Sequence, residues 1–248
     1  PFSPGGEAAG MVASVGESVK HLKVGDRVMG LTGFGSFAEK VATDAMRVLP
    51  MPDDMDYVTA AGFSMTYGTS MHALKQRGEL KPGETLLVLG ASGGVGLAAV
   101  EIGKAMGADE LINYSEVSLK DAVKELTNGQ GADVIYDPVG GDLFDQAVRS
   151  INWKGRLLVV GFASGRIPEF PINLALLKGS SIVGVFWGAF AAREPQANLE
   201  NFQQLFRWHS EGKLKPLVSQ TFELNEYEAA LDILSSRKAV GKVVVKTR

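Results

Sequence analysis

The 248-residue sequence contains no cysteine and only three histidines. Without cysteine the chain has no disulfide bond, no thiolate nucleophile, no iron–sulfur cluster and no zinc site with cysteine ligands. The histidines His21, His72 and His209 are far apart in the sequence, and we expect each to be a surface or packing residue. The composition therefore predicts a protein without a bound metal, and it fits a reducing compartment such as the cytoplasm.

The sequence also lacks a long hydrophobic run and an excess of basic residues. No apolar stretch reaches the roughly 20 residues that span a bilayer, and Pro1–Glu7 lacks the basic, then apolar profile of a signal peptide. The net charge is −3, and there is no basic patch interleaved with aromatic residues. We therefore expect a cytoplasmic protein with no membrane partner and no nucleic-acid partner.

What is present is an ordinary globular composition, 45% hydrophobic and 21% charged. The length allows one large domain or two small ones. Residues 1–50 are β-rich and punctuated by glycine, with strands expected over Glu7–Val15, Asp26–Leu31 and Ser36–Thr43. They are followed by a helix through Ala61 with Asp53 or Asp54 as its N-cap, and by a second helix over Tyr67–Gln76.

From Thr85 onward strands and helices alternate, which is typical of a parallel sheet. The fold class we predict is α/β, with a Rossmann-type doubly wound parallel sheet. The expected strands are Thr85–Leu89, Glu110–Tyr114, Asp133–Tyr136, Arg156–Gly161, Ile182–Phe186 and Lys242–Lys246, and the expected helices are Gly94–Met106, Leu119–Thr127, Leu143–Ser150, Glu200–Ser210 and Asn225–Ser236.

A glycine-rich loop, Gly90–Gly96, joins the first of these strands to the first of these helices. Its Ala91-x-Gly93-x-x-Gly96 spacing fits the dinucleotide fingerprint, in which small residues allow a tight turn and a close approach of the backbone to a pyrophosphate. The following helix would present its N–H groups to the phosphates. No Lys-Ser or Lys-Thr pair follows the loop, so a nucleoside triphosphatase is not indicated.

Spacing offers one candidate for the residue that binds the ribose of the cofactor. An acidic residue about 20 positions after the glycines would bind the 2′-hydroxyl of NAD. Glu116 is near that spacing, although it follows Tyr114 and Ser115 instead of ending the strand. Spacing alone therefore favours NAD through Glu116.

Several motifs in order, over nearly the whole chain, resemble one known family. The chain resembles the zinc-independent quinone oxidoreductases, the zeta-crystallin-like group of the medium-chain dehydrogenase/reductase superfamily. The motifs that carry the resemblance are Pro4–Gly10, Val24–Val28, Gly35–Glu39, Thr66–Thr69, His72–Leu74, Gly90–Gly96, Asp137–Gly141, Gly161–Gly165 and Gly241–Val244.

The resemblance implies two domains. Residues 1–60 would form a partial GroES-like catalytic domain, to which residues 216–248 would return, and residues 61–215 would form the Rossmann nucleotide-binding domain. Zinc-dependent relatives carry Gly-His-Glu where this chain has Gly5-Gly6-Glu7, so a zinc ligand is replaced by Gly6. The resemblance and the composition therefore agree in predicting no metal.

The resemblance also implies a set of cofactor contacts. Tyr114 and Arg237 would flank an adenosine 2′-phosphate, which favours NADPH over NADH, although Tyr114 could simply end a strand and Arg237 could be a cation at a helix C-terminus. Phe186 and Trp187 could equally be core or subunit contacts. The full set of expected cofactor-binding residues is Thr66, Ser92, Gly93, Gly94, Val95, Tyr114, Val139, Phe162, Ala163, Phe186, Trp187, Gly188, Arg237 and Lys242.

The function that this resemblance implies is NADPH-dependent transfer of a hydride, between the two domains, to a quinone or a similar electron-poor acceptor, without zinc. The alternatives are reduction of the double bond of an enoyl thioester or alkenal and, in another class, a non-catalytic NADPH-binding or structural protein. No catalytic residue is assigned. Ile182–Phe186 could pair across a two-fold axis, so we expect a homodimer.

Two parts of the family pattern have no match in the sequence. One is the part of the GroES-like domain that precedes Pro1, and the other is a strand and helix expected between Met106 and Gly107. The motifs on both sides are intact, which favours residues dropped from the sequence over a natural deletion. An intact mass equal to that of the 248 residues would contradict this expectation.

Overall fold

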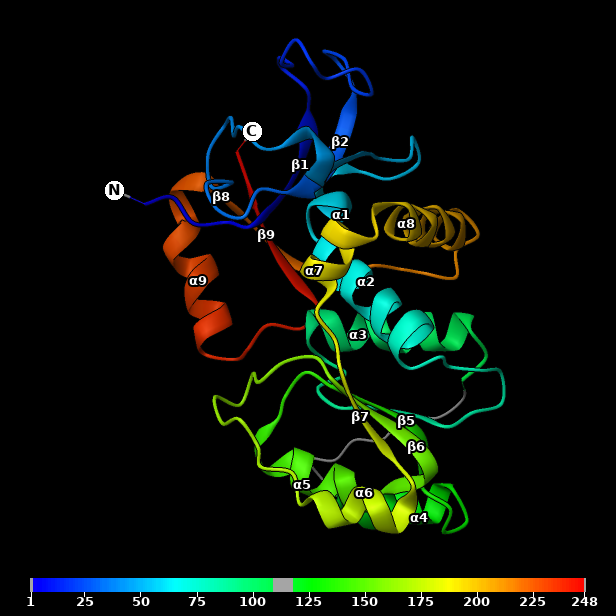
Figure 1. Cartoon of the computed structure of the whole chain (residues 1–248). Helices are drawn as coiled ribbons and strands as arrows, with labels where there is room; N and C mark the ends of the chain where they lie inside the picture. The colour runs from blue at the N-terminus through cyan, green and yellow to red at the C-terminus, as the bar shows by residue number, and fades with distance from the viewer. Residues whose placement is uncertain (1, 109–117, 248) are drawn as a thin grey trace. The chain divides into compact units, whose positions relative to one another are not determined.

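The computed structural model describes residues 2–108 and 118–247 (Figure 1). By its internal contacts the chain divides into two compact units. The first comprises Pro1–Thr66 and Pro216–Arg248, and the second comprises Tyr67–Lys215.

The first unit contains two small sheets. Strands β1 (Glu7–Met11), β2 (Arg27–Leu31) and β3 (Val48–Pro50) form an antiparallel sheet in that order. Strands β8 (Val218–Glu223) and β9 (Lys242–Lys246) form a parallel pair. The helices of this unit are α1 (Tyr57–Ala61), α9 (Tyr227–Ser235) and two short 3₁₀ turns, η1 (Ala45–Arg47) and η3 (Leu224–Glu226).

Two predictions for this unit were wrong. Ser36–Thr43 is not a strand, because β2 pairs with β1 on one side and with β3 on the other and has no edge left. The first helix is capped by Asp56, whose carboxylate accepts from the Thr59 N–H, and not by Asp53 or Asp54. The Arg27 guanidinium donates to carbonyls of the segment 52–55, which holds that segment in a non-helical path.

The second unit is built on a parallel four-stranded sheet, as predicted. Its strands, in spatial order, are β4 (Leu86–Val88), β5 (Ala132–Asp137), β6 (Ile151–Val159) and β7 (Ser181–Gly184). Its helices are the π-helical segment η2 (His72–Arg77), α3 (Gly94–Ala105), α4 (Leu119–Leu126), α5 (Gly141–Arg149), α6 (Ile172–Lys178), α7 (Trp187–Arg193) and α8 (Pro195–Ser210), while α2 (Ser64–Met71) contributes residues to both units.

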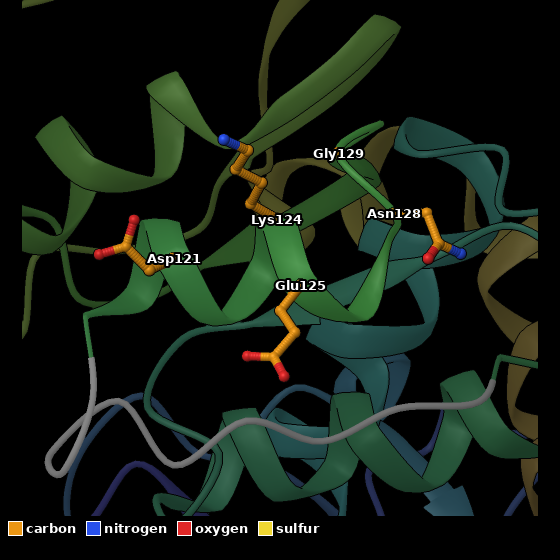
Figure 2. A pocket seen from close by; sticks show the side chains of 5 residues that line it. All are labelled: Asp121, Lys124, Glu125, Asn128 and Gly129. Atoms are coloured by element: carbon orange, nitrogen blue, oxygen red, sulfur yellow. The ribbon is translucent and has the colours of Figure 1, made fainter.

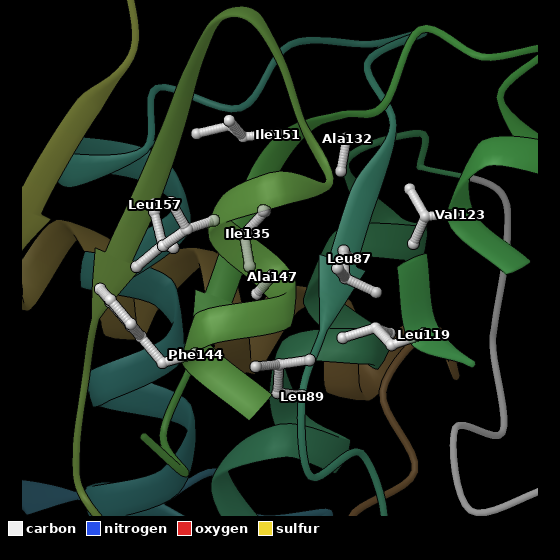
Figure 3. Packing of buried hydrophobic residues seen from close by; sticks show 11 residues of the cluster. Leu87, Leu89, Leu119, Val123, Ala132, Ile135, Phe144, Ala147, Ile151 and Leu157 are labelled. Carbon is white, nitrogen blue, oxygen red and sulfur yellow. The ribbon is translucent and has the colours of Figure 1, made fainter. Parts of the chain in front are cut away.

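Helices cover both faces of this sheet, α3 on one side and α4 and α5 on the other (Figure 1). Leu87, Ile135 and Leu157 are buried in a cluster with side chains of α4 and α5 (Figure 3). Their neighbours Leu86 and Leu158 lie close to Gly103 of α3 and to Gly78 after η2, on the opposite face. Burial on both faces explains why these strands read as continuous apolar runs.

The element boundaries differ from expectation in a few places. β6 begins at Ile151, before the predicted start at Arg156. The first part of the strand was missed because a bulge, with Lys154 at a φ of 59°, interrupts its apolar pattern. β7 ends at Gly184, so Phe186 lies outside it as the N-cap residue of α7. The sequence pattern did not predict α6, α7 or β8, and the strand expected over Glu110–Tyr114 lies outside the described residues. In the described ranges, no helix combines the length and the apolar character that crossing a membrane requires.

Candidate functional site

The loops that follow β4, β5 and β6 meet at the carboxyl edge of the parallel sheet. A Cβ placed on Gly90 would lie 2.9 Å from Val139 Cγ2, so the first loop touches the second. The N–H of Ala163 donates to the Pro138 carbonyl at 3.1 Å and that of Ser164 to the Val139 carbonyl at 2.9 Å, so the second touches the third. Ligands of open α/β sheets bind at this edge. The structure therefore brings the predicted residues Val139 and Ala163 next to the glycine-rich loop.

The glycine-rich loop folds back on itself in a way that requires glycine. Gly90 has a φ of +63°, which L side chains rarely adopt. The Gly93 N–H donates to the Gly90 carbonyl at 3.0 Å, closing the turn. A Cβ on Gly96 would lie only 2.2 Å from the same carbonyl oxygen. Helix α3 therefore starts directly against the loop, and this close approach is the one expected of the fingerprint.

The absence of a side chain at Gly93 has a different explanation. Gly93 is the N-cap residue of α3, and a Cβ there would meet only ordinary contact, 3.5 Å from the Gly90 carbonyl oxygen. Packing within the described residues thus does not require glycine at this position. No side chain in the described part of the chain caps the helix here, and the N–H groups of its first turn have no acceptor within the helix. Together with exposed Ser92, these groups can hold a pyrophosphate.

The second loop is shaped by a buried carboxylate that the sequence analysis missed. Asp137, at the end of β5, is 2% exposed, and its Oδ1 accepts from the N–H groups of Val139 and Gly140, both at 2.8 Å. Burial raises the pKa of Asp137, while these two hydrogen bonds act in the opposite direction. An aspartate two residues before such N–H groups is the pattern of an Asx turn, and Asp137-Pro138 could have been recognised on that basis.

The third loop carries the exposed residues Phe162 and Ala163. A Cβ on Gly140 would lie 3.1 Å from Phe162 Cδ1, and a Cβ on Gly141 would lie 2.7 Å from Ser164 Oγ. Arg166 anchors this loop on α5 through ion pairs with Asp142 and Asp145. Phe162 is therefore held near the second loop, with its ring open to a ligand.

The two aromatic residues in the segment after β7 differ in exposure. Phe186 is 76% exposed, whereas Trp187 is 7% exposed and packs against Gly68, where a Cβ would lie 2.5 Å from the indole ring. The indole Nε1 donates to Asn198 Oδ1 at 2.9 Å. Trp187 is thus a core contact in this unit, while Phe186 and Gly188 face solvent.

Three of the predicted cofactor residues belong to the first unit. The Thr66 hydroxyl is buried and donates to the carbonyl of Gly62, the C-cap residue of α1, at 2.8 Å. Lys242 forms an ion pair with Glu7, whose other carboxylate oxygen accepts from the Met65 N–H. Arg237 is exposed, just beyond α9, with a φ of +58°. Tyr114 and Glu116 lie outside the described residues.

The described residues do not form a zinc site. Within residues 2–108 and 118–247 no three metal-ligating side chains come together, and position 6 is glycine. His72, one of the three histidines, is stacked on Phe190 with ring centroids 4.0 Å apart. The predicted absence of metal remains a prediction.

One hollow of about 390 Å³ lies beside α4, away from these loops (Figure 2). It contains none of the predicted cofactor residues, and two of its side chains are carboxylates, which suit an anionic dinucleotide poorly. Its lining residues are Asp121, Lys124, Glu125, Asn128 and Gly129.

Two family models match the chain. Residues 1–53 match the alcohol dehydrogenase GroES-like domain, and residues 106–245 match the zinc-binding dehydrogenase family. A quinone oxidoreductase-like protein 2 homolog of Nematostella vectensis is 38% identical over 100% of this chain and 74% of its own length. The chain belongs to the quinone oxidoreductases of the medium-chain dehydrogenase/reductase superfamily.

Solved structures of this superfamily agree with the fold. Escherichia coli quinone oxidoreductase complexed with NADPH superposes with a TM-score of 0.88, 28% identity, and coverage of 99% of this chain and 83% of its own. The CurK enoyl reductase superposes with a TM-score of 0.86, 26% identity, and coverage of 99% and 79%. The chain is thus an oxidoreductase with an α/β Rossmann-type unit and a GroES-like unit.

The match with the Nematostella relative is longer than this chain. The match runs over 270 residues, against 248 in this chain. About 22 positions of this match therefore have no counterpart in this chain.

Proposed function

We propose that the chain is an NADPH-dependent oxidoreductase that reduces a quinone or a similarly electron-poor acceptor without zinc. The observation that carries the proposal is the loop Gly90–Gly96, where the chain's own packing requires Gly96 but leaves room at Gly93. When bound, NADPH supplies the hydride from its nicotinamide ring. The named homologues and the NADPH complex of a structural neighbour support the same chemistry.

The chain's own residues would bind and orient the cofactor. The first-turn N–H groups of α3 and the Ser92 hydroxyl would hold the pyrophosphate. Asp137 fixes the turn that places Val139 beside Gly90. Phe162, and Phe186 with the backbone near Gly188, would face the nicotinamide. Arg237 and Tyr114 would pair with the 2′-phosphate, which favours NADPH over NADH.

The acceptor class follows from the missing metal ligands. A zinc ion would polarise a carbonyl oxygen, and the chain has no cysteine and no clustered histidines to hold one among its described residues. Quinones and conjugated enones are already electron-poor and need less polarisation. Reduction of an enoyl or alkenal double bond is the second candidate, supported by the likeness to the CurK enoyl reductase.

Steady-state NADPH oxidation measured with a quinone and with a conjugated enal would separate the two candidates. We expect a higher kcat/KM with the quinone, a higher KM for NADH than for NADPH, and no loss of rate with a metal chelator. A higher kcat/KM with the enal would favour the second candidate. Turnover of neither acceptor by protein that binds NADPH would contradict the proposed activity.

The proposal includes the assembly and location of the protein. β7 has an edge that no strand of the described ranges covers, and α6 beside it exposes Ile172, Leu176 and Leu177. A second copy of the chain would cover both. The expected cytoplasmic location is tested by cell fractionation.

A further inference from the structure

Two consecutive hydrogen bonds connect strand β5 to the glycine-rich loop. Tyr136 on β5 and Ser70 on α2 are both 0% exposed, and their hydroxyl oxygens are 2.9 Å apart. The Ser70 hydroxyl donates to the Val95 carbonyl at 2.9 Å. Because Ser70 has a single hydroxyl hydrogen, the Tyr136 hydroxyl is the donor to Ser70. These hydrogen bonds thus connect β5, through α2, to the first turn of α3.

These hydroxyls are not needed to satisfy the backbone. Val95 lies inside the regular part of α3, where the helix itself provides a donor to its carbonyl. The surroundings are largely apolar, and burying two hydroxyls there is costly unless both are paired. Burial raises the pKa of Tyr136, which keeps it protonated and able to donate. What the pair provides is a fixed position of the first turn of α3 relative to β5.

The neighbouring residue acts on the same loop from the other side. Successive residues of a strand point to opposite faces, so Asp137 projects away from the face of Tyr136. Asp137 holds the N–H of Val139, which in turn packs against Gly90. The last two residues of β5 therefore fix both ends of the loop Gly90–Gly96.

We propose that Tyr136 and Ser70 are positioning residues for the pyrophosphate: they set where the first turn of α3 presents its N–H groups. This inference rests on the proposed function, because it assumes that the loop binds a dinucleotide. It assigns no contact between these hydroxyls and the cofactor.

The test compares Tyr136→Phe and Ser70→Ala with the wild-type chain by calorimetric titration. The ligands are NADPH, 2′-phospho-ADP-ribose, which contains the pyrophosphate, and adenosine 2′-monophosphate, which lacks it. Loss of one hydrogen bond predicts a roughly three- to tenfold higher Kd for the first two ligands. The Kd for adenosine 2′-monophosphate and the kcat at saturating NADPH stay unchanged.

Tyr67→Phe is the matched control. Tyr67 is also buried on α2, and its hydroxyl donates to Glu101 Oε2 at 2.6 Å, nearly two turns farther along α3. We expect this variant to lower thermal stability and to leave the Kd for NADPH unchanged. Equal weakening by Tyr67→Phe and Tyr136→Phe would show that general destabilisation is the cause and would overturn the inference.

Ser70→Ala keeps the inference open to refutation if Tyr136→Phe does not fold. Folded Ser70→Ala protein with an unchanged Kd for NADPH overturns it. Where both variants fold, the double variant should weaken binding no more than Ser70→Ala alone, because Ser70→Ala already removes both hydrogen bonds. A wild-type chain that fails to bind NADPH would instead overturn the proposed function, and with it the inference.

Discussion

At the scale of single residues, alanine substitutions at Gly93 and Gly96 are expected to have different effects, one on cofactor affinity and the other on stability. A Cβ on Gly96 would meet backbone atoms at 2.2 Å, so Gly96→Ala forces the loop and helix apart and costs about 1–3 kcal/mol of unfolding free energy. A Cβ on Gly93 meets only ordinary contacts but enters the space expected for the pyrophosphate. We predict that Gly93→Ala keeps its melting temperature within a few degrees and loses at least about tenfold in NADPH affinity.

Thermal unfolding and calorimetric titration of the two variants check this prediction. Gly16→Ala is a suitable control for alanine substitution, because a Cβ there meets nothing within 4 Å. Gly93→Ala protein that binds NADPH as well as the wild type would contradict the assignment of the loop.

His72 gives the stability a dependence on pH. Its ring is buried and stacked on Phe190, and its Nδ1 has no hydrogen-bond partner among the described residues. Burial lowers the pKa of His72, although a hydrogen bond with Gln76 and the charge of Glu194 act the other way, and Arg77 lowers it further. The unfolded chain, with an ordinary histidine pKa of about 6.5, then binds a proton that the folded chain does not.

The contribution of His72 to the free energy of unfolding should therefore be fully present above about pH 6.5. It should decrease as the pH falls from about 6.5 towards the lowered pKa of His72 in the folded chain. Urea unfolding of His72→Leu between pH 5 and pH 7.5 should show a smaller fall than the wild type. Gln203→Leu is the control, because Gln203 is exposed and carries no titratable group, so this variant should keep the pH dependence of the wild type. Equal pH dependence in the wild type and His72→Leu would contradict the prediction.

At the scale of elements, Asn201 ties α8 to the π-helical segment η2. Asn201 is 1% exposed; its Oδ1 accepts from Gln76 Nε2 at 2.9 Å and from Lys75 Nζ at 3.1 Å, and its Nδ2 donates to Gln76 Oε1. Asn201→Ala leaves the Gln76 amide without these partners, and we predict a loss of about 1–3 kcal/mol of unfolding free energy. Gln203→Ala, on the exposed face of α8, should change it by less than about 0.5 kcal/mol. Urea unfolding of both variants measures the difference, and equal values would contradict the role of Asn201.

The elements that the sequence predicted well are those with a buried apolar pattern. β4, β5 and β9 are runs of branched or large apolar residues, and they were placed within two residues of their ends. Helix α6 was missed because its apolar residues do not mark a single buried face: Leu174 packs against the buried cluster, whereas Ile172, Leu176 and Leu177 are exposed. Helix α7 is short and has no side-chain cap to mark its start.

The candidate site was predictable to the extent that it depends on backbone. The loop Gly90–Gly96 was found because its glycines are needed for the turn and for the approach of α3. The Tyr136–Ser70 pair was not found, because a hydrogen bond between residues 66 positions apart leaves no local pattern. The hydrogen bonds of Asp137 are local, and its Asx turn was a signal that the sequence analysis overlooked. The resemblance supplied the residues of the first unit, whose role no spacing rule indicates.

At the scale of the whole molecule, the sheet of the second unit has one edge that bears on assembly. β7 pairs with β6 alone among the described strands, so no strand of the described ranges covers its outer edge, where the Gly184 carbonyl accepts from Arg77 Nε at 2.9 Å. Ile172 and Leu176 of α6 are each 81% exposed, and α6 leads directly into β7. A monomer rarely exposes so much apolar surface in one region. Antiparallel pairing of two β7 strands across a two-fold axis would cover the edge and the helix together.

Light scattering during size-exclusion chromatography tests this arrangement. We predict that the wild-type chain elutes as a dimer at micromolar concentration and that the double substitution Ile172→Glu and Leu176→Glu gives a monomer, because two carboxylates per copy would be buried without partners. Leu126→Glu is the control: Leu126 is also exposed, but it is at the end of α4, so this variant should remain a dimer. A wild-type monomer, or dimers that survive the double substitution, would exclude α6 from the interface.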